Sequence, residues 1–390
     1  MPRFDTVAIR EREDLSPVLD ILMLNDDDMR YLSFVNFLPK IVDVFGAPVK
    51  AQKYEWQDDQ AQPETVLSGT SGAGTLWDNV ATVASLPVNA GQINRLRVGD
   101  VLQLPLPATN LAEQVIVKSI NTVANTIDVY ARGHGGTTAT AQGTGALSMK
   151  LIGNAQSEVS DVIDPLQISP TDAYNYTQIF EDVADVSGTL RRSSTVMGDL
   201  HDYAVVKKLK EKTRQLNYSL VQGRRNLDIT NKVSTMGGMR QLFSNTYAVG
   251  GALTLAKLYS ALETHLNAGL FPHQIHGSIR AISSIEQLFP GVVQKMNDET
   301  TMGLTVSQVN IMGYQIKLYP DRQISSDEFY IVDRNRVAYG PLAGGEYEDG
   351  NFAIYPLYDR RHGKRFASQI LGEFTCRVSN GGGTRATGLV

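Results

Sequence analysis

The sequence predicts an α+β protein into which a separate all-β domain is inserted, and three stretches carry this prediction. Residues 199–222 have the pattern of one uninterrupted amphipathic helix. Residues 66–158 are rich in Gly, Thr, Ala, Val and Asn, and apolar residues alternate in short runs there. From Val309 onward most segments have strand-like alternation. A chain of 390 residues that is 42% hydrophobic is long enough for about two or three domains.

The N-terminal region predicts a polar arm, two short helices and an exposed extended segment. Ser16 and Pro17 supply an N-cap and a proline at the first helical position, and Pro39 closes a second helix. We interpret Asp26–Asp28 as caps of that second helix rather than metal ligands, because ligands usually come from several directions. Residues 46–64 are polar, which indicates an extended arm.

The segment Val66–Glu158 predicts a compact module of short strands. Its alternating apolar runs are Leu102, Leu104 and Leu106; Val115 and Val117; Ile127 and Val129; and Leu147, Met149 and Leu151. Asn125 between two runs indicates a turn. Its glycine-rich stretches, 69–74 and 133–145, lack the Gly-Lys-Ser/Thr ending of a phosphate-binding loop, so we interpret them as turns. The abrupt change of composition predicts an autonomous domain.

The helix at residues 199–222 is predicted to be a structural spine. Its apolar stripe follows steps of three and four residues and contains Val206, Leu209, Leu216 and Leu220. Lys207, Lys208, Lys210, Lys212 and Arg214 fall mostly off the stripe and form a basic face. At ~1.5 Å per residue the helix would be about 36 Å long. We interpret it as an amphipathic core helix with a solvated basic face rather than as a binding helix.

Helices and strands mix after the spine. Met236–Met239 reads as a glycine turn, and Thr254 caps a helix that Gly269 ends. Residues 275–282 read as a strand, followed by a helix with a capping box at Ser283 and Glu286. Further strands are predicted at 314–318, 329–332, 352–355 and 374–378.

Composition and motifs argue against catalysis and against general nucleic-acid binding. The net charge is −5, and the single cysteine, Cys376, reads as a buried thiol in a reducing compartment. His273 and His276 lie three residues apart without other placed ligands, so we assign them a surface or turn role. No zinc spacing or Gly-x-Ser-x-Gly elbow occurs, and no signal peptide or membrane-spanning run is present. We therefore predict no catalytic, cofactor-binding or metal residues and no cofactor.

A series of short motifs resembles the major capsid proteins of tailed bacteriophages, whose shell fold is shared with herpesvirus capsid proteins. The motifs are Arg12–Leu15, Lys53–Asp59, Asn175–Phe180 with Val186–Thr189, Met236–Met239, and Leu371–Thr375 with Asn380. Together they span most of the chain in the order of the family.

The resemblance implies a domain layout. It comprises an N-terminal arm (1–45), an extended loop and return strand (46–65 and 159–190), an inserted β domain (66–158), a peripheral domain with the spine helix (191–235 and 346–390) and an axial domain (236–345). The arm starts close to Met1 and leaves no room for the scaffolding segment that some relatives carry, so a separate scaffolding protein is expected. Some relatives crosslink a lysine to an asparagine, but nothing in the sequence places a partner for Lys50 or Lys53.

The resemblance further implies a non-enzymatic viral major capsid protein that self-assembles into pentamers and hexamers of an icosahedral shell around double-stranded DNA. Expected partners are copies of the same chain, a scaffolding protein, a portal, decoration proteins and DNA bound without sequence specificity, and no membrane. The expected location is the virion capsid, assembled in the host cytoplasm. The alternative is a host- or carbohydrate-binding virion surface protein that acts through residues 66–158; a hydrolase would need a catalytic cluster.

Two charged runs near the C-terminus are candidate intersubunit contacts. Glu346 and Glu348 lie in an acidic run, and Arg360, Arg361, Lys364 and Arg365 lie in a basic one. Both runs are too polar for a core. Solvated loops are the simpler interpretation; the sharper one is that they meet opposite charges on neighbouring subunits.

Overall fold

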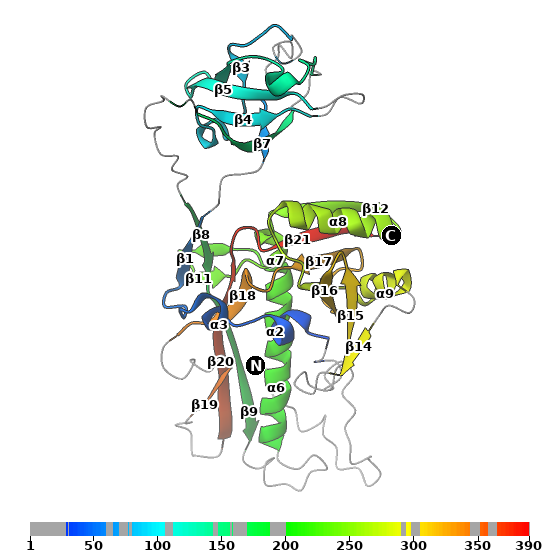
Figure 1. Cartoon of the computed structure of the whole chain (residues 1–390). Coiled ribbons are helices and arrows are strands. Elements are labelled where there is room, and N and C mark those ends of the chain that lie inside the picture. The colour runs from blue at the N-terminus through cyan, green and yellow to red at the C-terminus, as the bar shows by residue number, and fades with distance from the viewer. Residues whose placement is uncertain are drawn as a thin grey trace. The chain divides into compact units, whose positions relative to one another are not determined.

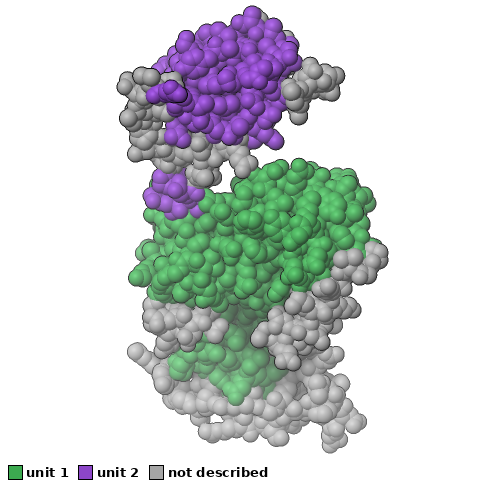
Figure 2. Space-filling model, viewed as in Figure 1, with its two compact units in different colours: residues 1–56, 172–390 green, residues 57–171 purple. Residues whose placement is uncertain are grey.

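The computed structural model describes residues 29, 31–59, 65–69, 77, 80–105, 112–142, 147–156, 158, 170–187, 200–289, 294–297, 305–343, 352–357 and 365–389. The chain divides into two compact units, shown in Figure 2. The larger unit contains residues 1–56 and 172–390, and the smaller contains residues 57–171. Each unit is described by itself.

The smaller unit is built on one antiparallel sheet in the order β2-β7-β4-β5-β6-β3. The strands are β2 (Thr65–Leu67), β3 (Leu86–Pro87), β4 (Asp100–Gln103), β5 (Gln114–Asn121), β6 (Thr126–Val129) and β7 (Ser148–Asn154). Alternate residues such as Val115, Val117, Ile127 and Val129 are buried in one cluster, as the alternation predicts. Asn125 has a left-handed backbone in the turn between β5 and β6. Two 3₁₀ turns, Ile93–Arg95 and His134–Gly136, complete the described elements of the unit.

The larger unit contains a seven-stranded mixed sheet in the order β12-β21-β17-β13-β16-β15-β14. The strands are β12 (Asn245–Gly251), β21 (Gly383–Leu389), β17 (Glu328–Val332), β13 (Gln274–Gly277), β16 (Tyr314–Pro320), β15 (Thr305–Ile311) and β14 (Gln294–Asn297). Helices α8 (Leu255–Asn267) and α9 (Ile279–Leu288) share a buried apolar cluster with this sheet. Thr254 caps α8 as predicted, because its side chain accepts a hydrogen bond from the Lys257 N–H.

The long helix α6 (Leu200–Gln222) packs against a second sheet of the same unit (Figure 1). That sheet contains β18 (Val337–Pro341), β20 (Arg365–Val378), β19 (Ala353–Leu357) and β9 (Gln178–Ser187). β9 pairs with β20 from Arg365 to Phe374, while β19 and β18 pair with it over 367–371 and 374–378. The predicted spine helix and the predicted return strand are therefore packing partners.

Short elements complete the described part of the larger unit. They are α2 (Ser33–Phe37), α3 (Ile41–Phe45), α7 (Met239–Leu242), and the strand pairs β1 (Lys53–Asp58) with β8 (Thr171–Tyr176) and β10 (Asn226–Asp228) with β11 (Val233–Thr235). The mixed α+β architecture agrees with the sequence prediction. Within the described residues no helix is both long and apolar enough to cross a membrane.

The predicted strand at 275–282 and the capping box at Ser283 are wrong. The strand ends at Gly277, and the helix already begins at Ile279. Ser278 is the cap, because its Oγ accepts a hydrogen bond of 3.1 Å from the Ala281 N–H. The predicted strand therefore covered two different elements, the end of β13 and the first turn of α9.

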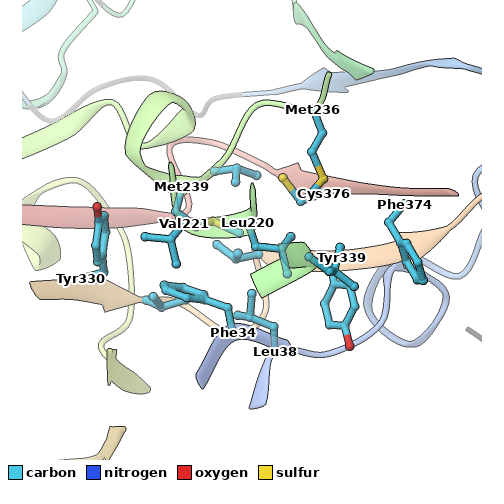
Figure 3. Close-up of a cluster of buried hydrophobic side chains, with 14 of the residues drawn as sticks. Phe34, Leu38, Leu220, Val221, Met236, Met239, Tyr330, Tyr339, Phe374 and Cys376 are labelled. Carbon is cyan, nitrogen blue, oxygen red and sulfur yellow. The ribbon is translucent and has the colours of Figure 1, made fainter. Parts of the chain in front are cut away.

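The main core of the larger unit gathers side chains from the N-terminal segment, α6 and both sheets (Figure 3). Phe34 and Leu38 come from the segment around α2, Leu220 from α6, and Tyr330 and Phe374 from the two sheets. Cys376 lies in the same cluster and is fully buried, as predicted, and burial raises the pKa of its thiol to about 12. The N-terminal segment is thus part of the core rather than an appendage to it.

Candidate functional site

The first turn of α2 is capped by side chains that lie far away in the sequence. Its N-cap residue, Leu32, has no side-chain oxygen, so the first N–H groups need other acceptors. The Ser33 N–H donates to Asp321 Oδ2 at 2.8 Å, and the N–H groups of Phe34 and Val35 both donate to Asn217 Oδ1 at 3.1 Å. Two remote residues thereby replace a local cap.

Asn217 uses its whole amide group in this network. In addition to accepting from α2, its Nδ2 donates to Asp321 Oδ2 at 3.0 Å and to Gln323 Oε1 at 2.7 Å. The residue lies inside α6 between the buried Leu216 and Leu220. Asparagine is a poor residue for a helix interior, so its contribution here comes from hydrogen bonds rather than from helix propensity.

Asp321 is fully buried just after β16 and is surrounded by donors. Its Oδ2 accepts from the Ser33 N–H, from Ser33 Oγ at 2.8 Å and from Asn217, while its Oδ1 accepts from the Gln323 N–H at 2.7 Å. Burial raises the pKa of the Asp321 carboxyl, and the hydrogen bonds oppose this shift. We call Ser33, Asn217, His276, Asp321 and Gln323 the α2 lock.

His276 closes the other side of the lock. Its Nδ1 lies 2.9 Å from Ser33 Oγ, its Nε2 lies 3.1 Å from Gln274 Oε1, and its ring stacks on Phe34 with centroids 4.4 Å apart. Burial lowers the pKa of His276 to about 3, so the ring is neutral at pH 7. The predicted surface or turn role is wrong for His276, because β13 is buried on both faces.

The lock joins segments that are remote in the chain: the N-terminal segment, the spine helix α6, strand β13 and the loop after β16. Asp321 and Asn217 accept hydrogen bonds from the first turn of α2, and burial keeps His276 neutral, which suits a structural joint. Within the described residues no group of His, Cys, Asp and Glu side chains has the arrangement of a metal site. The site therefore works by holding α2.

Burial of the predicted spine stripe increases along α6, and only Val206 departs from it. Leu216 and Leu220 are buried in the main core, and Leu209 is partly buried. Val206, in contrast, is 51% exposed. The helix contacts β9 at that end through Leu200 and Ala204, so Val206 does not belong to the stripe that this chain buries.

The basic face of α6 is also less solvated than predicted. Lys208 and Lys212 reach Asp182 of β9 with N–O distances of 3.5 and 3.4 Å. Lys208 also pairs with Glu211 at 3.3 Å. Part of the basic face therefore contributes to helix–sheet packing.

Of the predicted intersubunit residues, the structure describes only Arg365. Glu346, Glu348, Arg360, Arg361 and Lys364 lie outside the described residues. Arg365 begins β20 opposite Ser187. Their role stays a prediction.

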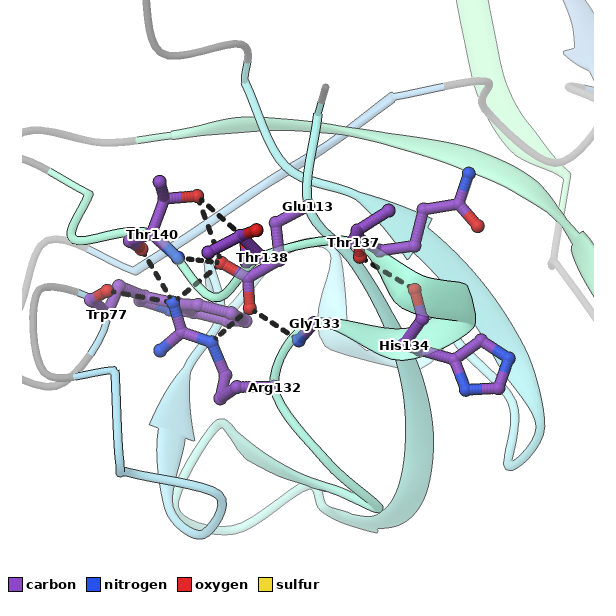
Figure 4. A network of polar contacts seen from close by, with 9 residues as sticks. Trp77, Glu113, Arg132, Gly133, His134, Thr137, Thr138 and Thr140 are labelled. Carbon is purple, nitrogen blue, oxygen red and sulfur yellow. Dashed lines mark hydrogen bonds and ion pairs between the residues drawn. The ribbon is translucent and has the colours of Figure 1, made fainter. Parts of the chain in front are cut away.

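The smaller unit has a buried ion pair of its own (Figure 4). Arg132 donates to Glu113 through Nε at 2.6 Å and Nη2 at 3.0 Å, and both side chains are almost completely buried. The Gly133 and Thr140 N–H groups also donate to Glu113. Burial tends to raise the pKa of Glu113, but the Arg132 and backbone hydrogen bonds outweigh it and leave the pKa lowered. The pair fixes the glycine-rich stretch at 133–142, which agrees with the prediction of turns rather than a phosphate loop.

A family model described as SU10 major capsid protein matches residues 6–384. No curated protein matches the chain. Similar solved structures include the cyanophage A-1(L) capsid asymmetric unit, at 12% identity and a TM-score of 0.44, covering 61% of this chain and 85% of that one. The SrpI encapsulin complex from Synechococcus elongatus is 12% identical with a TM-score of 0.39, covering 58% and 78%. Mycobacterium phage Bobi is 12% identical with a TM-score of 0.39, covering 60% and 79%.

Proposed function

This chain belongs to the SU10 major capsid protein family, and from this premise we propose how its structure serves a viral shell. The resemblance predicted from the sequence motifs is confirmed, and the function is that of a capsid shell protein. We propose that copies of the chain assemble as pentamers and hexamers of an icosahedral shell that encloses double-stranded DNA. The chain acts without a cofactor, by repeated association rather than by catalysis.

The structural observation that carries the proposal is the firm attachment of the segment around α2. The α2 lock holds the N-terminal segment through Asp321 and Asn217. An arm that contacts a neighbouring subunit gains effective concentration there when its root is held in one position on its own subunit. The lock supplies that fixed root.

The root of the extended loop is attached by stacked cations. The Arg225 guanidinium lies 3.9 Å from the ring centre of Tyr174 and donates to the Tyr174 carbonyl at 2.5 Å, and Lys53 Nζ lies 4.7 Å from the same ring. The Arg377 guanidinium lies 5.5 Å from the ring centre of Trp56. Such contacts contribute about 0.5–2 kcal/mol each. They hold the strands β1 and β8, which lie within the proposed extended loop and return strand, to the larger unit.

Electron microscopy of the assembled full-length protein tests the shell assignment. We expect closed shells with pentameric and hexameric capsomers, formed with a separate scaffolding protein in the host cytoplasm. A portal, decoration proteins and DNA bound without sequence specificity belong to the same proposal. Discrete small oligomers under the conditions of particle assembly would contradict it and favour a virion surface protein that acts through residues 66–158.

We also propose that the acidic run with Glu346 and Glu348 and the basic run from Arg360 to Arg365 face opposite charges on neighbouring subunits. Their electrostatic attraction would act mainly on encounter rate and register, and salt would weaken it. The test is assembly yield of an Arg360→Glu, Arg361→Glu double variant across a salt series. Equal yield of variant and parent at every salt concentration would remove these residues from the interface.

A further inference from the structure

A groove of about 1,000 Å³ lies in the larger unit beside α6, near the beginning of β9 and the loop at 322–325. Phe180 and Ile324 in its lining are buried, whereas Ile179 and Tyr218 are 56% and 52% exposed. The volume is at the upper end of small-molecule pockets and accommodates a stretch of chain. Half-exposed large apolar residues in one groove indicate a surface that another segment covers.

The charged residues of the groove are mainly basic. Lys212, Arg214 and Arg322 line it together with one carboxylate, Glu181. Glu181 already accepts a hydrogen bond from the Gln369 amide at 2.6 Å. The groove therefore suits a segment that combines large apolar side chains with acidic ones.

Residues 17–28 of this chain have that composition. They contain Val18, Leu19, Ile21, Leu22, Met23 and Leu24 together with Asp20 and Asp26–Asp28. The next residue that the structure describes, Met29, lines the groove itself. The segment thus leaves directly from the groove wall, which gives it a high effective concentration there.

We propose that residues 17–28 bind in this groove of their own subunit. The apolar residues cover Ile179 and Tyr218, and the aspartates lie near Arg214 and Arg322. The groove is continuous with the α2 lock through Gln323, which lines the groove, accepts from Asn217 and donates to the Arg214 carbonyl at 2.9 Å. Occupation of the groove extends the lock toward the N-terminus, and it does not depend on the shell assignment.

Photo-crosslinking in the full-length protein tests this proposal. It does not require knowledge of which residue of 17–28 contacts which residue of the groove. Tyr218 is replaced by p-benzoylphenylalanine, ¹⁵N-labelled and unlabelled subunits are mixed before assembly, and crosslinked peptides are mapped by mass spectrometry. We expect crosslinks between position 218 and residues 17–28 in which both peptides carry the same label. A probe at Met312, which is 53% exposed in the same unit and lies beyond the end of β16 opposite to the groove, serves as the control and should not reach this segment.

A matched pair of variants adds a second readout. With the probe at 218, Leu22→Asp should lower the crosslink yield several-fold, because it places a charge in the apolar contact, whereas Ile9→Asp should leave the yield unchanged. Crosslinks that join a labelled to an unlabelled peptide would show that a second copy fills the groove. Those crosslinks, crosslinks to other segments only, or none at all would overturn the proposal.

Discussion

Asn217 in the spine helix donates a hydrogen bond of 3.0 Å to Asp321, which follows it by 104 residues in the sequence. Both side chains are fully buried, and both also accept hydrogen bonds from the first turn of α2. One amide and one carboxylate thus hold the N-terminal segment against the spine helix and the loop after β16. Removing either side chain leaves buried N–H groups of α2 without hydrogen-bond acceptors.

Replacing Asn217 by leucine should destabilise the protein although the two side chains have similar shapes. The Phe34 and Val35 N–H groups would lose their acceptor, at about 1–3 kcal/mol for each unsatisfied group. We expect a fall of roughly 3 kcal/mol in the free energy of unfolding and faster hydrogen exchange in α2. The measurement is urea unfolding of the unassembled protein. Gln215→Leu, at an exposed position of the same helix, is the control, and equal losses in both variants would argue against the lock.

Local patterns were enough to predict the long helix but not the α2 lock. The steps of three and four residues placed the helix at 199–222, and the structure has it at Leu200–Gln222. Asn217 carries only a weak signal, a polar residue between the buried Leu216 and Leu220, and no local pattern points to Asp321. Partners so far apart meet only through the tertiary fold.

His276 and Val206 show two further limits of prediction from the sequence. Every residue of β13 is buried, so the strand has no alternation that would reveal a core histidine. Val206 has the correct spacing, but periodicity does not show that the sheet contacts Leu200 and Ala204 at that end instead. The sequence therefore predicts which residues share a face more reliably than which face is covered along a helix of this length.

Acidification should destabilise the protein through buried histidines. Burial lowers the pKa of His276 to about 3 and that of His265 to about 4, from the ordinary histidine value of about 6.5. Below pH 6.5 the unfolded chain binds protons that the native protein does not bind, so the free energy of unfolding falls as pH falls. The loss approaches about 1.4 kcal/mol per pH unit for each histidine between pH 6 and the folded pKa.

Urea unfolding between pH 7 and pH 5 measures this slope. His276→Gln should reduce it by about half, because one of the two buried histidines is removed, while His134→Gln at an exposed site should not change it. The Asp321 carboxyl has the opposite effect on the pH dependence of the free energy of unfolding. Its pKa is raised, so its contribution is present at low pH and is lost as pH rises through the folded pKa. An unchanged slope in the His276 variant would contradict the assigned neutral state.

Gly238 should not tolerate alanine, because the turn at Met236–Met239 passes against the end of α6. An added Cβ would lie 2.6 Å from the Ser219 carbonyl oxygen and 2.8 Å from both the Gly223 nitrogen and the Leu220 carbonyl oxygen. All three are backbone atoms, so the two segments must separate, at about 1–3 kcal/mol. Gly153→Ala is the matched control, because its Cβ meets nothing within 4 Å. Equal melting temperatures of the two variants would refute the close approach.

Glu113→Gln should unfold the smaller unit selectively. It leaves the Arg132 guanidinium buried beside a neutral amide, and breaking a buried pair in this way costs about 3–5 kcal/mol. Hydrogen exchange in the full-length protein should therefore rise in β4–β7 and stay unchanged in the larger unit. Asp128→Asn, which alters a solvent-exposed carboxylate on β6, is the comparison and should have a much smaller effect. Protection that persists in the Glu113 variant would show that the pair contributes little.

Leu216→Asp and Val206→Asp should separate folding from assembly on one helix. Leu216 is buried in the main core, so aspartate there places an unpaired charge among apolar side chains and should cost several kcal/mol, on the order of the largest point-mutant effects. Leu209→Pro should also prevent folding, because proline removes a helix hydrogen bond at ~3 kcal/mol or more.

Val206 is half exposed, so Val206→Asp should leave the free energy of unfolding within about 0.5 kcal/mol of the parent. If urea unfolding is unchanged for Val206→Asp but shells fail to form, the exposed end of the stripe is an intersubunit contact. Soluble, assembly-competent Leu216→Asp protein would instead count against the buried spine.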